Sequence, residues 1–96
     1  MVLLLVCAHV FANEPSTERQ AVLINMLKHD CGACHGLTLK GGLGPPLLAD
    51  ALTDKSAAML VEVIREGRKN TAMPPWKRFI SEQETWWLVN SILRKK

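Results

Sequence analysis

The segment Cys31-Gly32-Ala33-Cys34-His35 constrains this chain more than any other stretch of its 96 residues. Two thiols three positions apart, followed directly by an imidazole, are compatible with three kinds of site. They can form a redox dithiol, part of a zinc site, or the attachment point of a covalently bound haem. Since each site requires a different scaffold, the rest of the sequence has to distinguish among them.

The redox dithiol and the zinc site both fit poorly. A dithiol of the thioredoxin kind follows a strand and opens a helix in a βαβ unit. Here the pair closes a helical pattern, and no run alternates well enough to predict a strand. A structural zinc site needs four ligands. Cys31, Cys34 and His35 supply three at most, the adjacent Cys34 and His35 are awkward on one tetrahedron, and His29 is a distant fourth.

The haem interpretation uses every residue of the motif. The two thiols match the two vinyl groups when the chain makes one helical turn, and His35 then binds the iron. We predict Met73 as the sixth ligand, because thioether sulfur suits low-spin haem iron and Pro74 keeps Met73 out of helical conformation. Met26 and Met59 fall in helical apolar stripes instead, which predicts that they fill the core.

The first twelve residues, MVLLLVCAHVFA, differ from the rest of the chain in having no charged residue. They predict a secretory signal cut after Ala12, which leaves residues 13–96 as one domain in the periplasm. The segment is short and lacks a leading basic residue, so an uncleaved anchor and a truncated start remain alternatives. The apolar run is shorter than the roughly 20 residues that span a bilayer, and we expect no stable membrane span.

The charge distribution favours a protein partner over a nucleic acid. The net charge is only +3 with His neutral, and the dense basic tract is confined to residues 94–96. Basic residues do gather on both sides of Met73, and they predict a positive rim that would attract an acidic partner: Arg65, Arg68, Lys69, Lys77 and Arg78. We expect the protein to be a monomer.

Three helices and two long loops are predicted, which gives an all-α fold. The first helix starts near Thr17, which can cap it, and the second starts after Thr53 and ends at Gly67. The third opens with the capping box formed by Ser81 and Glu84. Residues 37–50 and 69–79 contain the Gly and Pro clusters that interrupt regular structure.

In this combination the sequence resembles the small monohaem class I cytochromes c, over nearly all of residues 13–96. The matching motifs are Cys31 to Gly36, Gly44-Pro45-x-Leu47, Met73-Pro74 and Ser81-x-x-Glu84. The resemblance implies three main helices and two long loops around one covalent haem c, with crossing first and last helices. It implies the following site residues: Cys31 and Cys34 for attachment, His35 and Met73 as axial ligands, and Pro45, whose carbonyl accepts the imidazole proton. Ser91 replaces an aromatic residue common in that family, and Trp87 is expected to take over its packing.

A narrower resemblance lies in residues 36–45 and in Met73-Pro74-Pro75-Trp76. These segments are similar to the short periplasmic cytochrome c encoded in denitrification operons beside the nitrite reductase that carries haems c and d. The resemblance implies a one-electron carrier, not an enzyme, with the nitrite reductase or its maturation proteins as partner. The alternative is an accessory electron acceptor in maturation of the haem d cofactor. A haem sensor or peroxidase would require a labile Met73.

Overall fold

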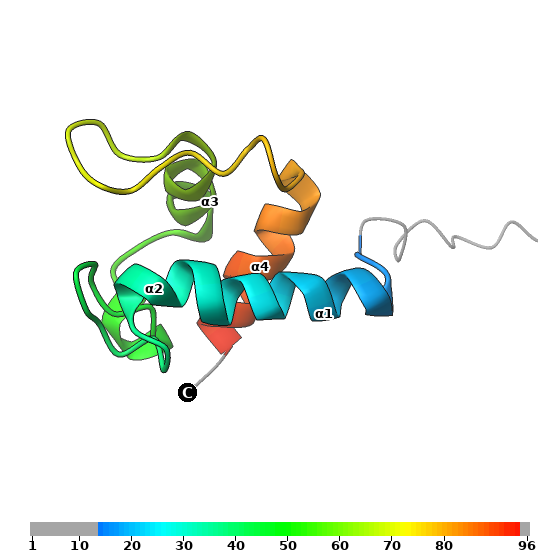
Figure 1. Cartoon of the computed structure of the whole chain (residues 1–96), viewed down its shortest axis with the longest axis horizontal. Coiled ribbons are helices and arrows are strands. Elements are labelled where there is room, and N and C mark those ends of the chain that lie inside the picture. Colours follow the sequence, from blue (N-terminus) through cyan, green and yellow to red (C-terminus); the bar gives the residue numbers. More distant parts are fainter. Residues whose placement is uncertain (1–13, 95–96) are drawn as a thin grey trace, which may run out of the picture.

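The computed structural model describes residues 14–94, and within them it contains helices and turns but no strand. In chain order the elements are α1 (Thr17–Met26), a π-helical turn (Leu27–Cys31), α2 (Gly32–His35), a 3-10 turn (Ala49–Leu52), α3 (Ala57–Glu66) and α4 (Glu82–Arg94) (Figure 1). The predicted all-α class is therefore confirmed. The predicted signal segment, residues 1–12, lies outside the described part.

Serine side chains cap all three main helices. Ser16 Oγ accepts the Arg19 N–H at 3.1 Å, so the predicted cap at Thr17 is wrong: Thr17 is already the first helical residue. Ser56 caps α3 in the same way, and its Oγ accepts the Met59 N–H at 3.1 Å. Each serine satisfies a backbone donor that the first helical turn leaves unpaired.

The capping box at the start of α4 is complete. The Glu84 N–H donates to Ser81 Oγ at 3.0 Å, and the Ser81 N–H donates to Glu84 Oε1 at 2.9 Å. The predicted end of α3 at Gly67 is also confirmed, because the Gly67 N–H bonds to Val63 O and closes the last turn. No helix between residues 14 and 94 is long and apolar enough to cross a membrane.

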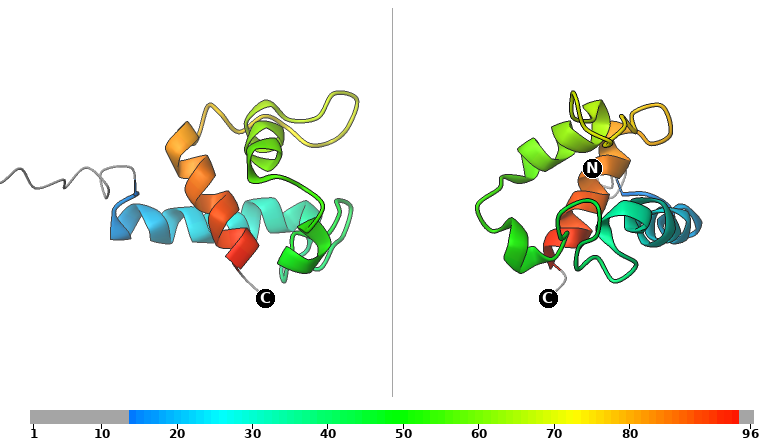
Figure 2. Two further views of the ribbon diagram at one scale, coloured as in Figure 1. Left: turned by 180° about the vertical axis from the view of Figure 1, so that it is seen from behind. Right: turned by 60° about the vertical axis from the view of Figure 1, so that its left-hand side comes forward.

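The core lies where α1 crosses α4 and where α3 packs against α4 (Figures 1 and 2). Leucine and isoleucine side chains from α1, the π turn, the loops, the 3-10 turn and α4 form one buried cluster: Leu23, Leu27, Leu39, Leu52, Ile80, Leu88 and Ile92. Met26 and Trp87 pack against this cluster, as expected for the helix crossing. Met59 is 42% exposed, so its predicted core position is wrong; the buried side of α3 is formed by Val61.

A π-helical turn joins α1 to α2 without a break in the helix (Figure 1). The Gly32 N–H bonds to Leu27 O, five residues back, where an α-helix would bond four residues back. Such a turn holds one residue more than an α-helical turn of the same height. The cysteine pair therefore ends a single long helix whose earlier part is anchored in the core.

The two long loops lie at the same end of the molecule, on opposite sides of it. One follows α2 and the other joins α3 to α4, as Figure 1 and the left view of Figure 2 show. The fold thus brings the Cys-x-x-Cys-His turn and the Met73 loop to one end of the protein. This agrees with the expected arrangement of two loops around one site.

Candidate haem site

Cys31 and Cys34 lie at the start of the site, one on each side of the junction between the π turn and α2. Both are half-buried free thiols. Burial, with a smaller contribution from the neighbouring Asp30 carboxylate, raises the pKa of the Cys31 thiol to about 11. The folded chain therefore keeps Cys31 as a protonated thiol at neutral pH.

His35 is fixed through one ring nitrogen. Its Nδ1 lies 2.6 Å from the carbonyl oxygen of Pro45. A carbonyl can only accept, so Nδ1 carries the proton and donates it. In the neutral imidazole this leaves Nε2 as the nitrogen with a free lone pair, which is the atom that ligates a metal. The contact that the resemblance implied is present, and the role of both residues toward iron stays a prediction.

Gly44 lets the loop lie directly against the imidazole ring. A Cβ at this position would lie 2.7 Å from His35 Cε1 and 2.8 Å from His35 Nδ1. The Gly44 N–H donates to Cys34 O at 2.8 Å, and the Gly41 N–H donates to His35 O at the same distance. The loop therefore closes around the end of α2. The sequence predicted a glycine turn here, but its contact with the ring depends on the path of the chain.

Met73 lies half-buried in the loop between α3 and α4. Its N–H donates to Thr71 Oγ1 at 3.2 Å, and its carbonyl accepts the Arg68 N–H at 3.2 Å. Further along, the Trp76 N–H donates to Ile64 O at 3.0 Å. The loop therefore runs back along the end of α3. His29, the distant fourth ligand of the zinc alternative, is exposed in the π turn.

This donor set fits a covalent haem. It offers two thiols one helical turn apart, an imidazole whose Nδ1 bonds to a carbonyl and whose Nε2 is left for a metal, and a thioether in a loop at the same end of the fold. Between residues 14 and 94 no group of three or more His, Cys, Asp or Glu side chains could hold a metal ion, which leaves the zinc site without support. The βαβ scaffold of a redox dithiol is also missing from the described residues.

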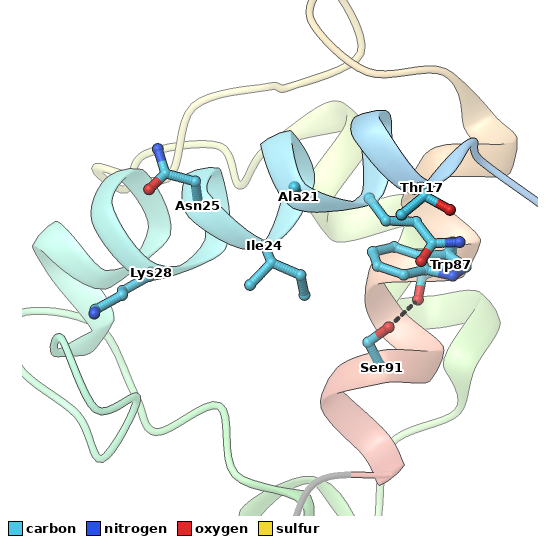
Figure 3. Close-up of a pocket in the computed structure, with 8 residues that line it drawn as sticks. Thr17, Ala21, Ile24, Asn25, Lys28, Trp87 and Ser91 are labelled. Atoms are coloured by element: carbon cyan, nitrogen blue, oxygen red, sulfur yellow. Dashed lines mark hydrogen bonds between the residues drawn. The ribbon is translucent and has the colours of Figure 1, made fainter.

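A shallow groove between α1 and α4 is separate from this site (Figure 3). Its lining residues are Thr17, Gln20, Ala21, Ile24, Asn25, Lys28, Trp87 and Ser91. None of the predicted attachment or ligand residues is among them. Ser91 Oγ donates to Trp87 O at 2.8 Å, and the Trp87 indole faces α1, as expected if Trp87 supplies the aromatic packing that Ser91 cannot (Figure 3).

Comparison with protein families identifies the class. Residues 21–90 match the family described as cytochrome c oxidase, cbb3-type, subunit III. The chain belongs to this family of c-type cytochrome domains, and such a domain carries covalently bound haem c. Cytochromes c are electron carriers and not enzymes, which agrees with the prediction from the sequence.

Three relatives named cytochrome c55X are similar to the chain. The one from Pseudomonas aeruginosa is 47% identical over 79 residues, which cover 82% of this chain and 66% of the relative. The chain thus spans just under two thirds of that relative's length. The one from Stutzerimonas stutzeri is 45% identical, with 85% and 73% covered. The one from Paracoccus denitrificans is 36% identical, with 98% and 91% covered.

Two solved structures share the fold. A c-type cytochrome named NirC has a TM-score of 0.81 and 46% identity, over 82% of this chain and 93% of that one. The dihydro-haem d1 dehydrogenase NirN, solved in complex with DHE, has a TM-score of 0.70 and 30% identity over 76% of this chain. The match covers 16% of NirN. These similarities confirm the predicted cytochrome c fold.

Proposed function

We propose that the protein is a periplasmic one-electron carrier of denitrification, with haem c attached to Cys31 and Cys34 and with His35 and Met73 as its axial ligands. The observation that carries the site is the hydrogen bond between His35 Nδ1 and Pro45 O, because it orients the ring and leaves Nε2 for iron. Residues 1–12 would be a signal segment, and residues 13–96 the mature monomeric domain.

The two proposed axial ligands limit the haem to electron transfer. Haem supplies an iron that alternates between its ferrous and ferric states. Because His35 and Met73 would fill both axial positions, no coordination site is left for a substrate. The protein would then hold the ligands in fixed positions and present a docking face, as a carrier does.

The proposed partner is the nitrite reductase that carries haems c and d, and the similarity to NirC supports it. A second candidate is that the protein accepts electrons during maturation of haem d. The similarity to part of NirN favours this candidate, because a dehydrogenase that oxidises a dihydro-haem has to pass its electrons to an acceptor. The two functions use the same site and differ in the direction of electron flow.

Stopped-flow mixing would separate the two functions. Reduced protein would be mixed with oxidised nitrite reductase, and oxidised protein with the dehydrogenase and its dihydro-haem substrate. Rapid oxidation in the first experiment would support the carrier, and rapid reduction only in the second would support the maturation role. Slow exchange in both would contradict the proposal.

The Met73 assignment needs its own test, for which Met59 provides a matched control. Met73→Ala should leave the haem attached, lower the reduction potential and allow added imidazole to bind. Met59→Ala should change none of these, and because Met59 is 42% exposed it should alter the free energy of unfolding by less than about 1 kcal/mol. The opposite result for the two variants would show that Met59 is the ligand.

A further inference from the structure

We infer that Gly67 is a positioning residue for Met73. Because Gly67 has no side chain, the backbone of the methionine loop can pack directly against it, and this packing places the Met73 thioether where it can ligate the haem iron. The inference rests on the proposed ligation of iron by Met73. It extends that proposal by identifying a residue that would affect the strength of the ligation through the backbone of the methionine loop.

The backbone of the methionine loop rests directly on Gly67. A Cβ at this position would lie 2.8 Å from Met73 O, 2.8 Å from Pro75 N and 2.9 Å from Pro74 C. All three are backbone atoms, so a change of rotamer cannot relieve the collision. Gly67 also has φ +73, a conformation that residues with a side chain rarely adopt. Any larger residue at position 67 would therefore push the backbone of the methionine loop away from α3.

Hydrogen bonds on both sides of Gly67 hold the loop down. The Arg68 N–H donates to Met73 O at 3.2 Å, and the Trp76 N–H donates to Ile64 O at 3.0 Å. Between these two bonds Pro74 and Pro75 have no N–H of their own. Contact with Gly67 therefore determines how closely residues 73–75 pack against the end of α3.

Thr71 fixes the other side of Met73. Its hydroxyl donates to Arg68 O at 2.8 Å and accepts the Met73 N–H at 3.2 Å. The residue before it, Asn70, has φ +62, so the chain turns sharply here. Gly67 and Thr71 therefore hold the Met73 backbone from two directions, and a displacement at either residue would be transmitted to the thioether.

The test compares two variants of the haem-loaded protein. Gly67→Ala introduces both backbone strain and the collision with the loop backbone. Asn70→Ala is the control, because residue 70 keeps its φ of +62 in the same loop and loses only an exposed side chain. In the ferric Gly67→Ala protein we expect the sulfur-to-iron charge-transfer band to weaken and imidazole to bind at least about tenfold more tightly than to the original protein. Asn70→Ala should keep both properties even if it is less stable.

Two further measurements keep the inference open to refutation. If Gly67→Ala yields no haem-loaded protein, Thr71→Val should weaken the same band, whereas Thr71→Ser, which retains the hydroxyl, should not. An unchanged charge-transfer band and imidazole affinity in Gly67→Ala would overturn the proposed positioning of Met73. If Gly67→Ala yields no haem-loaded protein, the same unchanged result in Thr71→Val would overturn it. An unchanged Met73→Ala protein would instead overturn the ligation by Met73, and the inference with it.

Discussion

Arg19 and Glu84 form a bidentate ion pair that joins the first turn of α1 to the first turn of α4. Arg19 Nε lies 2.7 Å from Glu84 Oε2, and Arg19 Nη2 lies 3.3 Å from Glu84 Oε1. Oε1 also accepts the Ser81 N–H of the capping box. One carboxylate therefore caps a helix and ties the two crossing helices together.

This pair predicts a pH-dependent contribution to stability. The hydrogen bond from Arg19 is the main cause that lowers the pKa of Glu84 from its ordinary value of 4.5. Because the unfolded chain then binds more protons than the folded one, stability rises with pH. The contribution is complete above pH 4.5 and is lost as pH falls through the lower pKa of the folded state.

Glu84→Gln should therefore lower the free energy of unfolding of the haem-loaded protein by about 1 kcal/mol at neutral pH. The loss should shrink to nothing in acid, where the original carboxyl is also uncharged. Urea unfolding of both proteins at a series of pH values measures it. A difference that persists unchanged into strong acid would indicate a packing effect.

Cys31→Ala or Cys34→Ala should greatly reduce the amount of haem-loaded protein, because each thiol would supply one of the two thioether bonds. Ala33→Ser, an exposed change between the two cysteines, should leave the yield intact. Denaturing gels stained for haem, after expression with a c-type maturation system, measure the outcome. A stained band of normal intensity in both cysteine variants would contradict covalent attachment.

Gly44→Ala should raise the reduction potential. The new methyl group would collide with the His35 ring and weaken its hydrogen bond to Pro45, and a less basic imidazole stabilises ferric iron less. Gly32→Ala is the control, since its Cβ would meet its nearest neighbour, the Cα of Leu37, at 3.4 Å. Redox titration of both proteins should show a shift in Gly44→Ala alone.

The structure divides the positive rim around Met73 into two groups. Arg65 Nη1 donates to Ile80 O at 3.0 Å and to Thr85 Oγ1 at 3.3 Å, so this guanidinium connects α3 to the start of α4. Lys77 pairs with Glu66 at 2.9 Å. The remaining members are exposed and form no ion pair with another residue in the range 14–94: Arg68, Lys69 and Arg78.

Arg68→Glu combined with Lys69→Glu should therefore slow electron exchange with an acidic partner and reduce its dependence on salt. The two changes remove attraction that is screened over about 8–10 Å at physiological ionic strength. Lys28→Glu is the control, because it also replaces a positive by a negative charge but lies in the groove between α1 and α4. Exchange rates measured against salt concentration would contradict the prediction if all three proteins behaved alike.

Features encoded by neighbouring residues could be predicted from the sequence. The capping box of Ser81 and Glu84 and the end of α3 at Gly67 depend on local backbone chemistry, and both are confirmed. The cap at Thr17 was misplaced by one residue because Ser16 and Thr17 offer equivalent hydroxyls. The contact between His35 and Pro45 was implied by the resemblance, and the structure contains it.

What depends on the path of the chain could not be predicted. The packing of the Met73 loop against Gly67 follows from the direction in which that loop returns along α3. Met59 has the apolar character of a core residue, but only the packing of α3 shows that it faces outward. The division of the positive rim likewise depends on contacts across the fold, since Arg65 finds its acceptors at Ile80 and Thr85.

The π turn also affects how this helix would respond to the loss of a residue. Loss of one residue from an ordinary α-helix rotates everything after it by about 100°. Between Leu27 and Gly32 the turn already holds one residue more than an α-helical turn would. Deleting the exposed His29 would let this segment close as a regular α-helix with the cysteines and His35 still facing the same way. The helix therefore has a point at which it can shorten without misdirecting the attachment motif.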